Sequence, residues 1–180
     1  MDVTTDGEYA IFLNGSYGVG KTATLDPIGN LLAEAGRPFS LMDVDWFHRS
    51  WPTADFDEHN TVIEARNMAA VWANYRSAGP RQLVVSGVLT GSVDVDRYAD
   101  ALGIAVRPVR LVADDATIRA RLRARYGATG AAELDWHLER YAGIRDRQAR
   151  GDLDEAVLPT DALQPVEVAR AVLAHFASAH

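Results

Sequence analysis

The sequence predicts an α/β fold in which helices cover both faces of a parallel β-sheet. Short apolar runs alternate with segments of helical periodicity along the chain, which is typical of strand–helix–strand units. The run at residues 82–88 is apolar, β-branched and bounded by turn residues, as expected for a strand buried on both faces. A glycine-rich segment, residues 15–22, separates the first apolar run from the first helical segment. Together these observations favour three layers, with ligands bound at the carboxyl ends of the strands.

The first part of the chain contains two strand–helix units. The apolar run 10–13 stops at Asn14 and predicts the first strand. Residues 22–36 carry leucine and isoleucine at helical spacing and end on a glycine. A second apolar run, 39–42, predicts the next strand. Residues 60–78 repeat apolar side chains at a period close to 3.6 and close on Gly-Pro, which predicts a helix.

The middle of the chain continues this alternation. After the strand at 82–88, residues 94–102 predict a short helix that ends at a glycine. Residues 105–112 predict a fourth strand. Because Pro108 cannot donate to a ladder, we expect it at a sheet edge or before the paired stretch. Acidic residues at the start of the segment 114–126 indicate a helix N-terminus.

The last part of the chain supplies a lid and a final strand–helix unit. Residues 126–134 are mostly small and include two glycines, so we expect them to form a short lid. A charged helix follows at 134–150, then a strand at 156–159 and an amphipathic helix at 165–176. No repeat or linker interrupts the chain, and we expect one domain over residues 1–180.

Composition excludes several classes of protein. Hydrophobic residues make up 48% and charged residues 24% of 180, and no apolar run is long enough to span a membrane. The N-terminus has no signal-peptide pattern, so we expect a cytoplasmic protein. A net charge of −7 argues against a nucleic-acid partner, and the lack of cysteine excludes thiolate chemistry.

The most specific motif is residues 15–22, which read G-x-x-x-x-G-K-T. In such a phosphate loop (P-loop), glycines leave backbone N–H groups open to phosphate at a helix N-terminus. Lys21 is expected to reach the terminal phosphates, and the hydroxyl of Thr22 to bind magnesium. The alternative is a glycine-rich turn that happens to contain Lys-Thr. The predicted nucleotide-binding residues are Gly15, Ser16, Tyr17, Gly18, Val19, Gly20, Lys21, Thr22, Ala23 and Arg121.

Two acids follow the second predicted strand. Residues two apart at a strand end project the same way, so Asp43 and Asp45 are expected to face the γ-phosphate together. One carboxylate would hold a magnesium ion, for which Asp43 is the candidate. The other, Asp45, would accept a proton from a substrate hydroxyl. The strand at 82–88 offers no acid at Ser86-Gly87 for the metal. Alternatively, both aspartates are ordinary loop acids that cap the following turn.

Arginines alternate along the helix at 114–126. Arg121 and Arg125 are spaced i, i+4 and precede a glycine-containing hinge, which favours a role over nucleotide phosphates as the lid closes. A solvated face with ion pairs is the alternative. Weaker candidates are Arg140 and Arg145 for the closed state and Arg66 for an anionic acceptor.

Aromatic residues follow the two acids. Trp46, Phe47 and Trp51 are positioned either to stack on an acceptor or to pack beneath a loop. His48 and His59 show no partner or spacing that indicates metal binding or catalysis, and we assign them no role.

In these features the chain resembles the nucleoside monophosphate kinase-like superfamily, which includes adenylate, shikimate and gluconate kinases. The carrying residues are the P-loop and the Arg-Leu-x-x-Arg element at residues 121–125. Asp43-Val44-Asp45 is similar to the Asp-x-Asp of shikimate kinases, in which the first acid serves magnesium and the second contacts the acceptor. Residues 44–45 also resemble a turn of chloramphenicol phosphotransferase, and residues 13–15 and 111–114 the tunicamycin-resistance ATP-binding protein. The resemblance implies strand order 2-3-1-4-5 and an adenine pocket between Arg121 and residues 159–162.

The acceptor-recognition residues of these kinases are not present in the region 46–66, and the lid at 127–132 lacks the internal arginines of many relatives. We therefore expect an ATP- and Mg²⁺-dependent kinase of a small hydroxylated molecule, with an antibiotic or nucleoside-like acceptor preferred over a core metabolite. Its catalytic residues would be Asp45, Lys21, Arg121 and Arg125. The alternative is an ATP-binding resistance or sequestration module, or an ATPase. We expect a monomer or homodimer.

Overall fold

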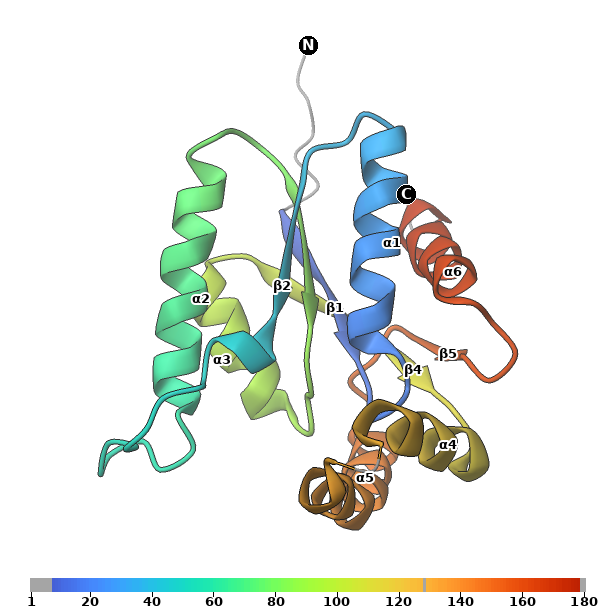
Figure 1. The fold of residues 1–180 in the computed structure, drawn as a ribbon. Helices are drawn as coiled ribbons and strands as arrows, with labels where there is room; N and C mark the ends of the chain where they lie inside the picture. The colour runs from blue at the N-terminus through green and yellow to red at the C-terminus, as the bar shows by residue number, and fades with distance from the viewer. Residues whose placement is uncertain (1–7, 128, 179–180) are drawn as a thin grey trace.

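The computed structural model describes residues 8–127 and 129–178. Five strands alternate with six α-helices and one 3₁₀ helix in the described residues (Figure 1). The strands are β1 (Tyr9–Asn14), β2 (Phe39–Asp43), β3 (Gln82–Ser86), β4 (Ala105–Val112) and β5 (Ala156–Pro159). The helices are α1 (Lys21–Glu34), η1 (Val44–Trp46), α2 (Thr61–Arg76), α3 (Ser92–Leu102), α4 (Asp115–Tyr126), α5 (Ala131–Gly151) and α6 (Pro165–Ser178).

All strands of the sheet are parallel, and their order is β2-β3-β1-β4-β5. Figure 1 shows α2 and α3 on one face of the sheet and α1 and α6 on the other, with α4 and α5 beside the carboxyl ends of the strands. This confirms the predicted α/β architecture and the strand order 2-3-1-4-5. No helix within residues 8–127 and 129–178 has the length and apolarity needed to cross a membrane.

Alternating side chains of β1 build two cores. Ala10 and Phe12 belong to the core beneath α2 and α3, whereas Ile11 and Leu13 belong to the core beneath α1 and α6. All four side chains are at most 1% exposed. A strand with alternating sides in two apolar cores must lie in the interior of a sheet that is covered on both faces. The P-loop therefore starts from the most buried strand of the molecule.

The structure corrects the expectation for Pro108. It lies within β4, between two neighbouring strands, and is in register with Phe12 of β1. Its carbonyl oxygen accepts a hydrogen bond of 2.8 Å from the amide of Glu155, just ahead of β5. Because the N–H and C=O of one strand residue point to the same side, the missing donor faces β5 before its pairing begins at Ala156. Proline is therefore tolerated in an interior strand here.

Several helix boundaries differ from the sequence prediction, and the short helix η1 was not predicted. α5 begins at Ala131 instead of residue 134, so the last part of the segment expected to form the lid is the first turn of this helix. The chain turns into η1 directly after β2, because Asp43 accepts a hydrogen bond from the amide of Asp45 and caps the turn. Only a few residues, 127–130, connect α4 to α5.

Candidate active site

The P-loop folds back tightly between β1 and α1. Its three glycines, Gly15, Gly18 and Gly20, have positive φ angles of 142°, 78° and 102°. A Cβ atom at Gly15 would lie 2.5 Å from the carbonyl oxygen of Leu111 in β4. The loop thus needs glycine both for its backbone conformation and for its close approach to β4. Its amides lead into the N-terminus of α1, where an anion is favoured.

The side chain of Lys21 lies against its own loop. Its Nζ donates hydrogen bonds of 2.7 Å to the carbonyl oxygen of Gly15 and 2.9 Å to that of Ser16. Burial lowers the pKa of Lys21 to about 8, although the carboxylates of Asp45 and Asp43 act in the opposite direction. The amine of Lys21 and the carboxylates of Asp43 and Asp45 therefore belong to one pocket.

Thr22 and Asp43 meet where α1 approaches the end of β2. The hydroxyl of Thr22 donates a 2.8 Å hydrogen bond to Oδ2 of Asp43, while Oδ1 accepts one of 3.1 Å from the amide of Asp45. Asp43 therefore caps η1, as the alternative of an ordinary loop acid predicted. It also contacts Thr22 of the P-loop. Two adjacent oxygen donors fit a magnesium ion that is otherwise bound by water and phosphate. Among the described residues no cluster of three or more His, Cys, Asp and Glu forms a metal site.

Asp45 lies in η1, so the strand alternation from which we predicted its direction ends at Asp43. The two carboxylates nevertheless line the same pocket. Within the part of the chain that the structure describes, no group donates a hydrogen bond to the carboxylate of Asp45. Its oxygens are therefore accessible to a substrate proton, whereas those of Asp43 are already engaged.

The two predicted arginines have different surroundings. Arg121 donates to the carbonyl oxygen of Thr160 at 2.7 Å and to its hydroxyl at 2.9 Å, and also reaches the carbonyl of Val19 at 3.3 Å. It thereby joins α4 to the P-loop and to the segment after β5. Arg125 also lines the pocket, and its charge contributes to the lowered pKa of Lys21. Arg125 and Lys21 thus line the same pocket, and within the described residues no hydrogen bond or ion pair engages the guanidinium of Arg125.

The other arginines lie elsewhere. Arg119 and Arg145 pair with the carboxylate of Asp115 at 3.5 and 2.6 Å. Arg140 pairs with Glu139 at 3.3 Å, and Arg66 is exposed on α2. None of these arginines lines the main pocket. The alternative of a solvated face with ion pairs therefore holds for Arg119 on α4, while Arg140 and Arg145 form ion pairs on α5 and Arg66 is exposed.

One pocket of about 790 Å³ joins these groups, which lies within the range of about 300–1,000 Å³ that is common for small-molecule sites. It runs from the segment Thr160–Pro165 past Lys21 to the carboxyl ends of β2 and β3. Of the predicted nucleotide-binding residues, Gly15 and Ser16 do not line it, and the hydroxyl of Ser16 donates instead to the carbonyl of Tyr141 at 2.7 Å. Pocket residues that the sequence analysis missed include Arg49, Ser86, Val88, Tyr126, Glu133 and His137.

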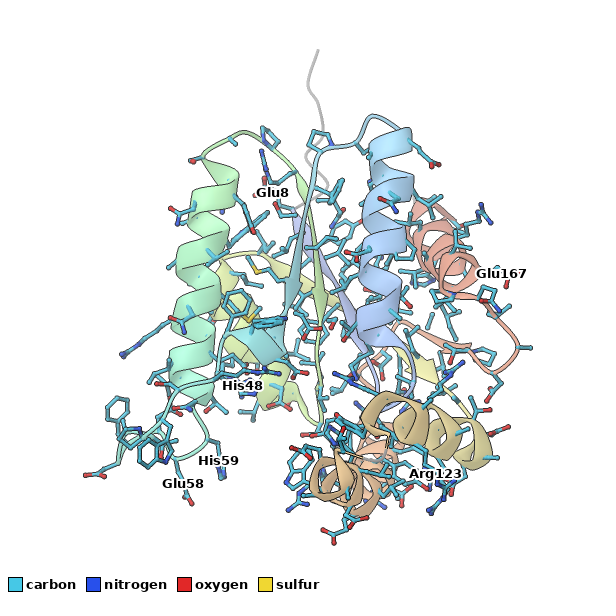
Figure 2. The ribbon with its side chains drawn as sticks, viewed as in Figure 1. Glu8, His48, Glu58, His59, Arg123 and Glu167 are labelled. Atoms are coloured by element: carbon cyan, nitrogen blue, oxygen red, sulfur yellow. The ribbon has the colours of Figure 1, made fainter. Side chains whose placement is uncertain are left out.

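The loop between η1 and α2 is tied to α2 at its base. Asn60 donates to the carbonyl oxygens of His48 and Ser50 at 2.8 and 2.9 Å. His48, to which we assigned no partner, contacts Oε2 of Glu64 through Nδ1 at 2.9 Å, and the hydroxyl of Tyr98 donates to the same buried carboxylate. Figure 2 shows His48 beside η1, with Glu58 and His59 at the outer end of the loop. His48 therefore fixes the base of this loop.

Asn14 connects the P-loop to three other segments. Its Oδ1 accepts hydrogen bonds of 2.8 Å from the amides of Gly15 and Leu89 and from the side chain of Gln148 on α5. Its Nδ2 donates to Asp154 at 2.8 Å. The side chain is fully buried, so water cannot replace these partners. Strand β1 ends here because the side chain of Asn14 takes up the amide that begins the loop.

We expect Asn14→Ala to lower the free energy of unfolding by about 3 kcal/mol, because several buried polar groups lose their partner at once. Gln148→Ala, which removes one bond to this side chain and one of 3.2 Å to the carbonyl of Leu89, should cost about 1–2 kcal/mol. Urea unfolding followed by circular dichroism measures both values. Equal losses for the two variants would contradict the central position of Asn14.

The sequence matches no protein-family model and shows no significant similarity to a curated protein. Solved structures are similar in fold. A gluconokinase from Sinorhizobium meliloti is 21% identical with a TM-score of 0.60, over 94% of this chain and 91% of that chain. A shikimate kinase from Acinetobacter baumannii, bound to shikimate, is 20% identical with a TM-score of 0.58 over 96% and 94%. APS kinase from Mycobacterium tuberculosis, bound to AMPPNP and APS, is 17% identical with a TM-score of 0.63 over 95% and 98%. The chain thus has the fold of P-loop kinases.

Proposed function

We propose that this protein is an ATP- and Mg²⁺-dependent kinase that phosphorylates a hydroxyl group of a small molecule. The observation that carries the proposal is the meeting of two groups of side chains in one pocket. Lys21 and Thr22 come from the P-loop after β1, and Asp43 and Asp45 come from the end of β2, on the far side of β3 in the sheet. Phosphoryl transfer needs a phosphate cradle, a metal and a group that orients the nucleophile, and this pocket offers residues for each.

The nucleotide base is proposed to lie between Arg121 and the segment after β5. Both line the pocket, and the bonds from Arg121 to Thr160 hold these walls together. The phosphates would lie along the P-loop amides, with Lys21 and Arg125 neutralising their charge. Arg121 then supports the P-loop and the base, while Arg125 is the arginine available to the phosphates.

Thr22 and Asp43 are the residues proposed to hold magnesium. Their oxygens are adjacent, and the ion prefers few protein ligands together with phosphate oxygens and water. Magnesium bound there would neutralise charge on the phosphates during transfer.

Asp45 is proposed to orient the acceptor hydroxyl and to take its proton. As the hydroxyl oxygen forms a bond to the γ-phosphorus, the bond from that phosphorus to the bridging oxygen breaks and ADP leaves. The proton of the hydroxyl passes to the carboxylate of Asp45, whose oxygens have no donor among the described residues. Lys21 stabilises the negative charge on the transferred group.

We further propose the domain organisation, the oligomeric state and the class of acceptor that the sequence suggested. The chain 1–180 would act as one domain, as a monomer or homodimer, on an antibiotic or nucleoside-like acceptor. Incubation with ATP, Mg²⁺ and a panel of hydroxylated antibiotics, nucleosides and sugars tests this, with mass spectrometry to detect an added phosphate. ADP release that no acceptor stimulates would instead support the ATPase or sequestration alternative.

ATP affinity should decrease with rising pH above about 8. The pKa of Lys21 is lowered to about 8, so the amine loses its proton above that pH, and bound phosphates favour the charged form. Binding therefore takes up a proton, and affinity should fall by up to about tenfold per pH unit. Calorimetry in two buffers of different ionisation enthalpy measures the uptake. Constant affinity and no proton uptake between about pH 7 and about pH 9.5 would contradict this role of Lys21.

A further inference from the structure

The acceptor end of the pocket is the end that contains Asp45, and this identification rests on the proposed function. The residues around it come from two sides. Asp45 and Arg49 follow β2, while Ser86 ends β3 and Gly87 and Val88 follow it. Any acceptor whose hydroxyl reaches Asp45 must lie against these residues.

This end contains few free hydrogen-bonding groups. Gly87 and Val88 add only backbone polar groups, and the side chain of Ser86 is almost completely buried. On the α4–α5 side, the hydroxyl of Tyr126 and Nε2 of His137 contact each other at 3.0 Å, and Nδ1 of His137 contacts the carbonyl of Glu133 at 2.6 Å. Their polar atoms are thus engaged with one another. A sugar or sugar acid, which needs a partner for each hydroxyl, fits such a lining poorly.

Aromatic rings line the pocket on the side of α4 and α5. Tyr126 and His137 are stacked with ring centroids 4.7 Å apart, and Tyr17 of the P-loop meets His137 edge-on at 4.6 Å. All three residues line the pocket. Tyr17 lines the same pocket as Asp45; burial raises the pKa of Tyr17, and the carboxylate of Asp45 raises it further. This cluster can pack against a planar ring.

Arg49 offers a second planar surface. Its guanidinium lies 4.9 Å from the ring centroid of Trp46, which is 72% exposed, and it also lines the pocket. No carboxylate in the described part of the chain forms an ion pair with Arg49. A guanidinium stacked on one aromatic ring can receive a second ring on its other face.

The charges at this end limit the acceptor further. The lining there contributes one positive charge, from Arg49, and two negative charges, from Asp45 and Glu133. Lys21 and Arg125 lie beside the P-loop and are occupied by nucleotide phosphates in the proposed reaction. A phosphorylated or otherwise polyanionic acceptor would meet net repulsion here.

We infer that the acceptor is an alcohol with an aromatic ring and at most one negative charge, and that Arg49 on Trp46 binds this ring. Aryl alcohols and nucleosides share this chemistry. Arg49, which lines the pocket, is the specificity-determining residue, because it contacts the ring and not the reacting hydroxyl. Trp46 does not line the pocket and is a positioning residue that holds the guanidinium from its other face. The aromatic cluster of Tyr17, Tyr126 and His137 encloses the ring from the lid side.

A matched pair of probes tests the inference. 1-Phenyl-1,2-ethanediol and 1-cyclohexyl-1,2-ethanediol differ in the aromatic ring but hardly in size, and uridine, gluconate and shikimate complete the panel. With the full chain, ATP and Mg²⁺, the phenyl compound should exceed the cyclohexyl compound about tenfold in kcat/KM. Equal values, or a preference for gluconate or shikimate, would overturn the inference. Whether uridine or the phenyl compound is better distinguishes the two sources of the ring.

Substitutions of Trp46 and Arg49 test whether this stacked pair causes the preference for an aromatic ring. Trp46→Ala and Arg49→Ala should each raise the KM for the aryl substrate about tenfold and change kcat less than about twofold. Trp51→Ala is the control, because Trp51 follows in the same segment and is 91% exposed, but no arginine of the described residues lies over its ring as Arg49 lies over Trp46. An equal effect of Trp46→Ala and Trp51→Ala would refute the role of Trp46.

Calorimetry with AMPPNP separates this inference from the kinase proposal. Binding of the phenyl compound that is lost in Arg49→Ala, without transfer from ATP, would support the aryl site and contradict the kinase function. Binding of AMPPNP without any binding or turnover of the aryl compounds would overturn the inference and leave the nucleotide site intact.

Discussion

Asp45→Asn is expected to lower kcat by about two to four orders of magnitude, which is the usual contribution of a general base. The amide keeps the size of the side chain but cannot accept the proton of the acceptor hydroxyl. The backbone bond from Asp45 to Asp43 does not involve the side chain of Asp45, so η1 and the metal-binding oxygens should stay in place. ATP affinity should therefore change little.

The measurement is steady-state kinetics with the acceptor that the panel identifies, together with calorimetric titration of ATP. Asp55→Asn serves as the matched control, since Asp55 is an exposed acid on the same loop outside the pocket, and it should leave kcat unchanged. A kcat near that of the unmodified protein would exclude Asp45 as the base. A loss confined to ATP affinity would place its effect on the nucleotide instead.

Lys21→Ala is expected to abolish detectable transfer and to weaken ATP binding by about tenfold or more, because the amine is proposed to neutralise the terminal phosphates. The substitution also removes the hydrogen bonds from Nζ to the carbonyl oxygens of Gly15 and Ser16. Binding of ATP should decrease more than binding of ADP, since the γ-phosphate loses its partner.

Fluorescent-nucleotide displacement measures both affinities. Arg66→Ala is the control for charge, because it removes one positive charge from an exposed position on α2 outside the pocket. If Lys21→Ala and Arg66→Ala weaken ATP equally, the effect is long-range electrostatics and the assignment of the loop lysine fails. Unchanged ATP affinity in Lys21→Ala would have the same consequence.

Local patterns were sufficient to predict the elements of this fold. Apolar runs bounded by glycine and proline marked the strands, and the spacing of leucine and valine marked the helices, because these patterns follow from one-sided or two-sided burial. The errors arose where the environment of a residue decided the outcome. Pro108 is tolerated in an interior strand because its missing N–H would face β5, whose pairing with β4 begins only at Ala156. The start of α5 at Ala131 depends on hydrogen bonds of the backbone, not on an apolar pattern.

The candidate site was only partly predictable for the same reason. The P-loop is a local motif, and its Thr22 meets Asp43 at the carboxyl end of the sheet, where the sequence placed both as candidate magnesium ligands. The hydrogen bonds of Arg121 to Thr160 and of His48 to Glu64 join segments that are distant in the sequence, so no local pattern predicts them. Asn14 was recognised only as the end of a strand. Its four partners come from α5, from the segment before β5 and from the segments after β1 and β3.

The lowered pKa of Lys21 has a consequence for the chemistry of the whole molecule. Lys21 is the only lysine in the sequence, and all other cationic side chains that stay charged at neutral pH are arginines. With a pKa of about 8, a sizeable fraction of this amine is uncharged and nucleophilic in mildly alkaline solution. An acylating reagent that modifies a lysine side chain of this sequence can therefore do so only within the P-loop. Attachment through its lysine side chain would block the phosphate loop itself.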